Sequence, residues 1–187
     1  MEQKVIKAAL EEVKVHGLRF TMSDVTRRLR MSKSSLYKLV PSKDLLIEEM
    51  QSYIMDTFNA REKRIHNSNL SLVDKVQQFI RAYLEMMRPL TTSGYFEDLQ
   101  LLYPEESARW DAFYKEKVGD FINLLQVGVE AGVLRPVCLP VVQHCLYVSA
   151  IGLANPSFLQ HYNLTYQQAV EALEDILFNG LMAGKQV

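Results

Sequence analysis

The chain has 187 residues, of which 48% are apolar and 23% charged, enough for one or two domains with a buried core. Its eight Gly and six Pro are too few for a disordered or collagen-like chain, and Cys138 and Cys145 alone cannot form a disulfide framework. No apolar run reaches the roughly 18 residues that cross a bilayer, and the N-terminus carries no secretory signal. We therefore expect a cytoplasmic protein without membrane partners.

The formal net charge of -1 is distributed unevenly along the chain. Residues 1–50 carry a net charge of +3, whereas residues 51–187 carry -4. Between Lys14 and Lys43, eight basic residues accompany a single acidic residue, Asp24. A basic end on an acidic chain indicates that this end binds a polyanion, although a charge run alone is more often a solvated face.

Apolar residues recur at the spacing of an amphipathic helix along almost the whole chain. Helix signals divide this pattern: Thr21 and Asp24 resemble a capping box, Gly17 is a C-terminal glycine, and Pro41 stops a helix. The predicted helices cover residues 5–16, 22–29, 33–39, 43–66, 71–88, 91–103, 104–130, 141–154 and 166–183. Because no strand or hairpin pattern interrupts them, the sequence predicts an all-α fold of about nine helices.

The two short helices at 22–29 and 33–39 fit the pattern of a helix-turn-helix. A tight turn at Arg30-Met31 joins them, and a preceding helix braces them. Their small common core would consist of Val25, Leu29, Met31 and Leu36. The second helix then presents Ser, Lys and Tyr side chains that can reach base edges and phosphates in a major groove. The candidate DNA-binding residues are Thr21, Arg30, Lys33, Ser34, Ser35, Tyr37, Lys38 and Lys43.

For single residues of this set, a structural role remains open. Tyr37 fits a half-buried core aromatic as well as a DNA contact, and the lysines also suit a helix that is merely soluble. The complete set, with its turn and its bracing helix, favours nucleic-acid binding.

The same residues carry a resemblance to a known family. Thr21–Val25, Met31–Tyr37 and Ser42–Leu46 resemble the N-terminal domain of TetR-family transcriptional regulators, and the similarity covers about the first 47 residues. The remaining residues match only in the order and length of their helices.

This resemblance implies a specific organisation. Residues 1–47 would form a helix-turn-helix DNA-binding domain, and residues 48–187 a helical effector-binding and dimerisation domain. The helix that follows Ser32 would be the recognition helix, and Lys43 would contact phosphate. A homodimer would bind a palindromic operator in double-stranded DNA.

Three positions depart from the family pattern. Arg30 stands where the turn usually has Gly, and a non-glycine residue at positive φ costs about 1 kcal/mol. Thr26 replaces a common Ala, and Leu39-Val40 replaces a usual aromatic pair. We expect a repacked but intact small core.

The C-terminal part has two features of its own. The last two helices are apolar on more than one face, so we expect them to form a four-helix homodimer interface. Clustered aromatic and Met side chains in the middle helices favour an apolar or aromatic small-molecule effector over a multiply charged one. For each of these residues, ordinary core packing is the alternative. The candidate ligand-binding residues are Tyr83, Met87, Phe96, Leu99, Trp110, Phe113, Phe121 and His144.

Motifs of enzymes and metalloproteins are missing from the sequence. There is no glycine-rich phosphate loop, no Gly-x-Ser-x-Gly and no His-Glu-x-x-His. Ser35-Leu36-Tyr37-Lys38 fits Ser-x-x-Lys, but the companion motifs of that acyl-transfer chemistry are absent. The scattered His and Cys residues do not form a ligand set. We therefore expect no catalytic residues, no metal and no cofactor.

The sequence thus predicts a DNA-binding transcriptional regulator, a repressor that a small molecule releases from its operator. The alternative is a helical interaction protein whose basic end binds an acidic partner without sequence specificity. A membrane-surface helix fits less well, because two turns interrupt the basic segment.

Overall fold

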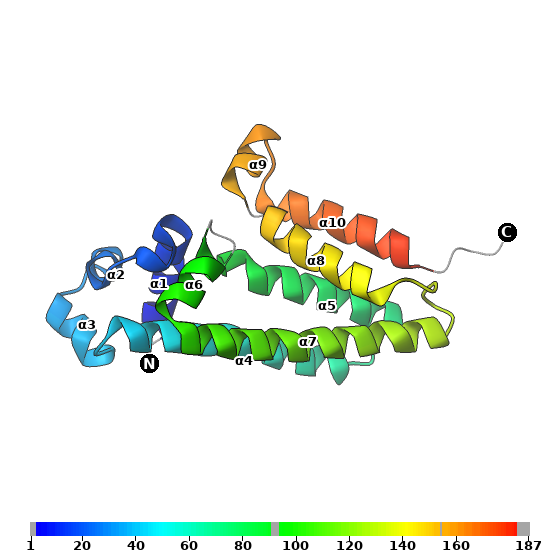
Figure 1. Cartoon of the computed structure of the whole chain (residues 1–187), viewed down its shortest axis with the longest axis horizontal. Helices are drawn as coiled ribbons and strands as arrows, with labels where there is room; N and C mark the ends of the chain where they lie inside the picture. The colour runs from blue at the N-terminus through cyan, green and yellow to red at the C-terminus, as the bar shows by residue number, and fades with distance from the viewer. Residues whose placement is uncertain (1–2, 91–93, 154, 183–187) are drawn as a thin grey trace. The chain divides into compact units, whose positions relative to one another are not determined.

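A computed structural model describes residues 3–90, 94–153 and 155–182 of the chain. Within these ranges the fold is all-α, as predicted, with ten α-helices and two short 3-10 helices (Figure 1). The elements are α1 (Gln3–His16), η1 (Gly17–Arg19), α2 (Met22–Leu29), α3 (Lys33–Leu39), α4 (Lys43–His66), α5 (Leu72–Met87), η2 (Arg88–Leu90), α6 (Tyr95–Leu102), α7 (Pro104–Glu130), α8 (Leu139–Leu153), α9 (Pro156–His161) and α10 (Tyr166–Leu181). None of the described helices is long and apolar enough to cross a membrane.

The helix boundaries follow local capping signals. Thr21 and Asp24 form the expected capping box at the start of α2, and Thr165 and Gln168 form another at the start of α10. Gly17 has a φ of +58°, as its role after α1 requires. The expected bounds of α2, α3 and α4 agree with the structure.

Helix α9 is absent from the sequence-based prediction of nine helices, which treats Asn155-Pro156 only as the end of the preceding helix. In the structure Asn155 also begins the next one, because its Oδ1 accepts a hydrogen bond of 2.9 Å from the backbone N–H of Ser157. Proline is favourable in the first turn of a helix, where its missing N–H costs nothing. Asn155-Pro156 therefore both ends one helix and begins the next.

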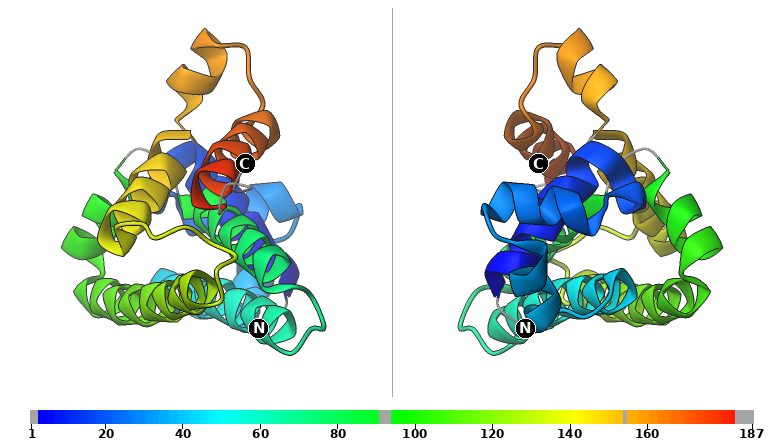
Figure 2. Two further views of the ribbon diagram at one scale, coloured as in Figure 1. Left: turned by 90° about the vertical axis from the view of Figure 1, so that its right-hand side faces the viewer. Right: turned by 90° about the vertical axis from the view of Figure 1, so that its left-hand side faces the viewer.

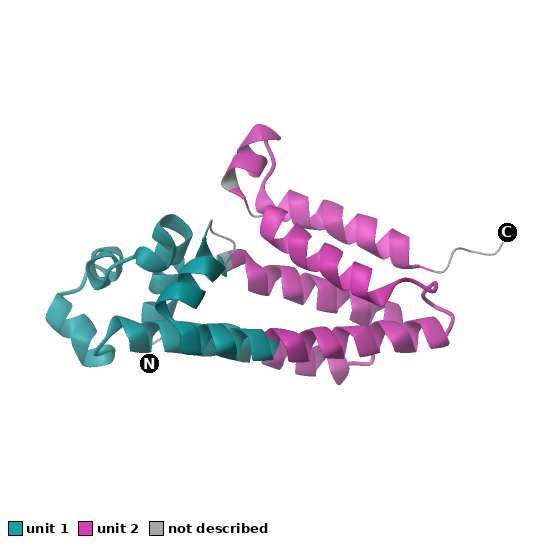
Figure 3. Ribbon diagram, in the orientation of Figure 1, with its two compact units in different colours: residues 1–57, 89–113 teal, residues 58–88, 114–187 magenta. Residues whose placement is uncertain are grey.

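The chain forms two compact units (Figure 3). Unit 1 comprises residues 1–57 and 89–113, and unit 2 comprises residues 58–88 and 114–187. The helix-turn-helix segment belongs to unit 1. The helices α4 and α7 each begin in unit 1 and end in unit 2.

Unit 1 is organised around the helix-turn-helix. Helix α1 packs on α2 and η1, α2 packs on α3, and α6 packs on η1. Of the expected small core, Val25 and Leu36 are fully buried, while Leu29 and Met31 are half-buried. The predicted core therefore forms, with Leu36 as the residue through which α3 is anchored.

In unit 2, α5 packs against both α8 and α10, and α8 also packs against α10. The side chains of Arg81 and Glu174 join α5 to α10 through two hydrogen bonds of 3.0 and 2.6 Å. The hydroxyl of Tyr166 donates a further bond of 2.7 Å to the carbonyl oxygen of Leu84. Helices α8 and α10 lie side by side, and α9 projects away from them (Figure 2).

Candidate nucleic-acid interface and ligand cavity

Helix α3 presents almost its whole surface to solvent. Only Leu36 of its seven residues is buried, and the side chain of Ser32 caps the helix by accepting a 3.0 Å hydrogen bond from the backbone N–H of Ser35. Tyr37 is 47% exposed, which favours a surface role over a core role. The exposed members of the predicted DNA-binding set on this helix are Lys33, Ser34, Ser35, Tyr37 and Lys38. A short helix with this composition has the donors and acceptors that major-groove binding requires.

The turn before α3 has the strained geometry expected from its sequence. Arg30 adopts the left-handed conformation, with φ 52° and ψ 44°, and its side chain is exposed. Its backbone N–H donates to the carbonyl of Arg27 at 3.2 Å, and the N–H of Met31 donates to that of Thr26 at 3.1 Å. These bonds close the C-terminus of α2 in the way a glycine-ended helix is closed.

Substitutions at Arg30 test the cost of this conformation. We expect Arg30→Gly to raise the free energy of unfolding by about 1 kcal/mol, because glycine adopts positive φ without a Cβ clash. The control, Arg30→Val, should lower it by about 1 kcal/mol or more, since a β-branched residue is least compatible with this backbone. Urea denaturation of both variants measures the difference, and equal midpoints would contradict the assignment of strain.

Two other candidate DNA-binding residues, Thr21 and Lys43, also have partners within the protein. The hydroxyl of Thr21 donates a 2.7 Å hydrogen bond to Asp24 Oδ2, although the residue is exposed. Lys43 Nζ donates a 2.6 Å bond to the carbonyl of Leu18 and lies 4.9 Å from the ring centroid of Phe20. Burial lowers the pKa of Lys43. An ammonium has three donors, so Lys43 can join α4 to η1 and still offer N–H groups to a phosphate.

An ion pair that the sequence did not indicate lies beside these residues. The guanidinium of Arg19 donates to Asp98 of α6 at 3.1 and 3.4 Å, and this hydrogen bonding raises the pKa of Arg19. Asp98 is 79 residues away in sequence, beyond the reach of any spacing rule. The pair connects η1, directly before the helix-turn-helix, with α6.

The predicted ligand-binding residues divide between the two units. Phe96, Leu99, Trp110 and Phe113 belong to unit 1, where the rings of Phe96, Trp110 and Phe113 form a chain of contacts at 5.8 and 5.9 Å between centroids. Tyr83, Met87, Phe121 and His144 belong to unit 2. All are buried except Phe96, which is half-buried, and His144, which is exposed. Each unit therefore contains four of the eight residues.

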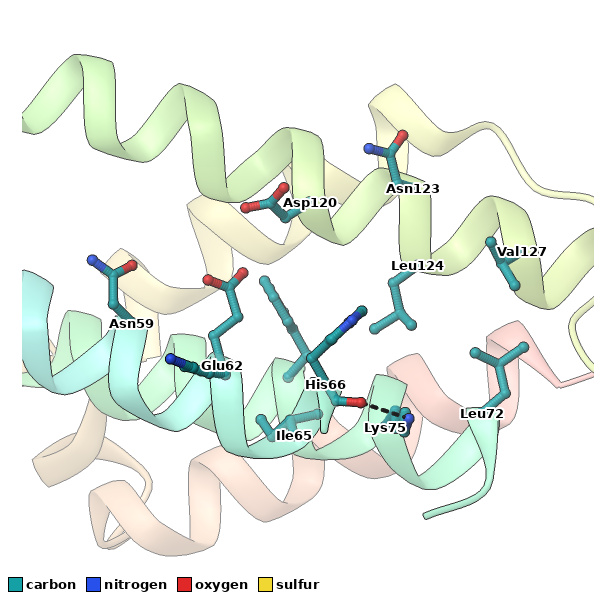
Figure 4. A pocket seen from close by; sticks show the side chains of 12 residues that line it. Asn59, Glu62, Ile65, His66, Leu72, Lys75, Asp120, Asn123, Leu124 and Val127 are labelled. Atoms are coloured by element: carbon teal, nitrogen blue, oxygen red, sulfur yellow. Dashed lines mark hydrogen bonds between the residues drawn. The ribbon is translucent and has the colours of Figure 1, made fainter. Parts of the chain in front are cut away.

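Unit 2 contains a cavity of about 630 Å³ between the second half of α4, the first half of α5 and the second half of α7 (Figure 4). This volume lies in the range of small-molecule sites. None of the eight predicted residues lines it. Tyr83 and Phe121 instead line a second cavity of only about 10 Å³, which has room for a single water molecule at most.

A buried lysine, Lys117, bonds to two of the residues that line the large cavity. Lys117 of α7 is 7% exposed, and its Nζ lies 2.6 Å from Glu62, 2.9 Å from Glu116 and 3.1 Å from Asp120. Burial lowers the pKa of Lys117, but the hydrogen bonds to these carboxylates outweigh that effect and raise it. Burial raises the pKa of Glu62, which lines the cavity, and the bond from Lys117 opposes this shift. The sequence alone did not indicate a charged group of this kind.

The chain is similar to transcriptional regulators over its full length. No protein-family model matches it. It is 26% identical over 188 residues to the uncharacterized HTH-type transcriptional regulator YvaF of Bacillus subtilis (strain 168), with 100% of this chain and 98% of the relative covered.

Solved structures of regulators share its fold. The ketosteroid transcriptional regulator KstR2 of Mycobacterium tuberculosis matches with a TM-score of 0.74, at 18% identity over 97% of this chain and 95% of that chain. The TetR family transcriptional regulator PfmR from Thermus thermophilus matches with a TM-score of 0.69, at 16% identity over 94% and 97%. AibR, in complex with isovaleryl coenzyme A and operator DNA, matches with a TM-score of 0.64, at 20% identity over 94% and 97%. The chain therefore has the fold of the TetR-family transcriptional regulators.

Proposed function

We propose that the protein is a ligand-responsive transcriptional repressor that binds a palindromic DNA operator as a homodimer. The observation that carries this proposal is the exposure of the Lys, Ser and Tyr side chains of α3, a helix in which Leu36 is the one fully buried residue. The match to AibR, which was solved with operator DNA and isovaleryl coenzyme A, supports both the DNA partner and the small-molecule effector.

Exposed apolar side chains on α8 and α10 of unit 2 support the homodimer. Val141 and Val148 on α8 are 56% and 50% exposed, and they lie seven residues apart on one side of the helix. On the neighbouring α10, Ile176 is 68% exposed. A second copy of this face would cover these side chains and form a four-helix interface with twofold symmetry. Two recognition helices would then read two half-sites together.

The cavity in unit 2 supports the effector response, because one of its walls is the second half of α4. The first half of the same continuous helix begins with Lys43, which is bonded to Leu18 of η1, just before the helix-turn-helix. A ligand that displaces α4 would change the spacing of the two recognition helices in the dimer. Coupling of this kind typically changes operator affinity by about 5–150-fold.

A salt titration on specific and random duplexes tests the proposed function against the alternative interaction protein. A sequence-specific regulator keeps a large affinity ratio between the two duplexes as the salt concentration rises. A basic domain that binds acidic partners without specificity would bind both duplexes alike, or neither.

Two variants extend this test to single residues. We expect Lys43→Ala to weaken binding to every duplex and to flatten the slope of log affinity against log salt by about one unit. The contact of Lys43 with Leu18 affects stability but not this slope, so the slope isolates a phosphate contact. Lys38→Ala should instead change which bases are preferred. Equal losses on all sequences for Lys38→Ala would contradict its placement in the groove.

A further inference from the structure

The large cavity in unit 2 has two chemically different ends (Figure 4). At one end, Leu72 of α5 and Val127 of α7 provide apolar surface, and Val127 is 52% exposed. Leu124 and Ile65 continue this surface toward the middle of the cavity. An apolar ligand is stabilised here, because binding removes from water both its own surface and the apolar side chains of the cavity. This end therefore fits a hydrocarbon chain or ring.

At the opposite end, Glu62 of α4 and Asp120 of α7 project toward each other (Figure 4). Both carboxylates bond to Lys117, which lies outside the cavity lining. Glu116 binds the same ammonium but is exposed and lies outside the lining, so Glu62, Asp120 and Lys117 together leave a formal charge of -1 at this end. This end of the cavity is therefore electronegative.

One oxygen at this end lacks a donor. Glu62 Oε2 accepts the bond from Lys117, but Oε1 is buried and has no hydrogen-bond partner among the described residues. A buried carboxylate oxygen without a donor is unfavourable by more than a neutral acceptor would be. Oε1 has almost no accessible surface, so a ligand in the cavity supplies its donor only after the Glu62 side chain turns toward the ligand.

The lysines that line the cavity do not provide this donor. Lys75 Nζ donates a 2.9 Å hydrogen bond to the carbonyl of His66, the last residue of α4. Lys63 is exposed, where water and salt screen its charge.

From this arrangement we infer that the cavity binds a small amphipathic amine, with its ammonium group against Glu62 and Asp120 and its apolar body along Leu124, Leu72 and Val127. The inference rests on the proposed function, in which this cavity is the effector site, and it specifies the chemical class of the effector. An amphiphile with a carboxylate head group would meet the same end with like charge and without a donor, so it binds more weakly.

Two amphiphiles of equal chain length test the charge preference directly. Isothermal titration calorimetry of the full chain without DNA, at pH 7, compares n-octylamine with octanoate. We expect octylamine to bind about tenfold more tightly or better, the difference that one charge-assisted hydrogen bond provides. Glu62→Gln, which keeps the shape of the side chain, should reduce octylamine affinity by about tenfold and leave that of octanoate unchanged or higher.

Two further variants serve as controls. Lys63→Gln removes an exposed charge next to Glu62 and should not lower octylamine affinity. Val127→Trp fills the apolar end and should weaken both probes. Octanoate binding as tightly as octylamine, no binding of either probe, or an unchanged ratio in Glu62→Gln would overturn the inference. The salt titration on specific and random duplexes separates the two claims. If one of these results is found and the protein still prefers its operator, the proposed function stands and the inference fails. If the protein prefers octylamine but has no operator specificity, the proposed function fails.

Discussion

Replacement of Ile176 by Asp is expected to leave the chain folded but monomeric, and to reduce affinity for a palindromic operator by about 100-fold or more. Ile176 is 68% exposed on α10, so a carboxylate there is solvated in the monomer at little cost. In the proposed dimer the same carboxylate would be buried against an apolar face without a partner. Each monomer would then bind a single half-site, without the added affinity that comes from joining two DNA-binding domains in one dimer.

Sedimentation and operator binding measure this effect on the same samples. The matched control is Leu101→Asp, because Leu101 is 74% exposed and lies on α6, which is not part of the proposed interface. Leu101→Asp should remain dimeric with unchanged operator affinity. A dimeric Ile176→Asp variant with full affinity would show that the homodimer uses another surface.

The second large effect is expected at Lys117. Replacing it by Met removes the one ammonium that bonds Glu62, Glu116 and Asp120. Breaking a buried ion pair from one side typically costs about 3–5 kcal/mol, and we expect about 3 kcal/mol because Glu116 and Asp120 are partly exposed. Lys115→Met, an exposed neighbour on the same helix, is the control and should change stability by less than about 0.5 kcal/mol.

The loss in Lys117→Met should depend on pH. Burial already raises the pKa of Glu62, and removing Lys117 takes away the hydrogen bond that opposes the shift. The folded state then binds more protons than the unfolded state, so its stability falls as the pH rises above the ordinary range of a carboxyl group and recovers as the pH is lowered. Urea unfolding at about pH 7.5 and about pH 5 should show a smaller loss at the lower value. An equal loss at both values would exclude Glu62 as the source of the instability.

Local signals in the sequence were sufficient for most of the fold. The capping boxes at Thr21 and Thr165 act over three residues, and the strained turn at Arg30 is set by its own backbone. Periodicity likewise located the exposed face of α3, because Leu36 and Leu39 lie on the covered side and the other five residues are exposed. Of the ten α-helices in the described residues, the prediction missed α9, since Pro156 can both stop one helix and start the next.

The hydrogen-bond partners of the charged residues near the DNA-binding helix and the cavity lie far away in the sequence. Lys43 reaches a carbonyl 25 residues away, Arg19 an acid 79 residues away, and Lys117 an acid 55 residues away. No spacing rule relates such positions, because the tertiary packing alone brings them together. The same holds for the large cavity, whose lining comes from three helices and includes none of the aromatic residues that composition suggested.

Selection of binding sites from a pool of random duplexes tests the central claim, that a dimer reads DNA with two copies of α3. We predict an enriched palindrome whose half-site centres lie about 10–10.5 base pairs apart or at a multiple of that spacing, bound by two chains or a multiple of two. Enrichment of no sequence, or of a single half-site bound by one chain, would contradict the claim.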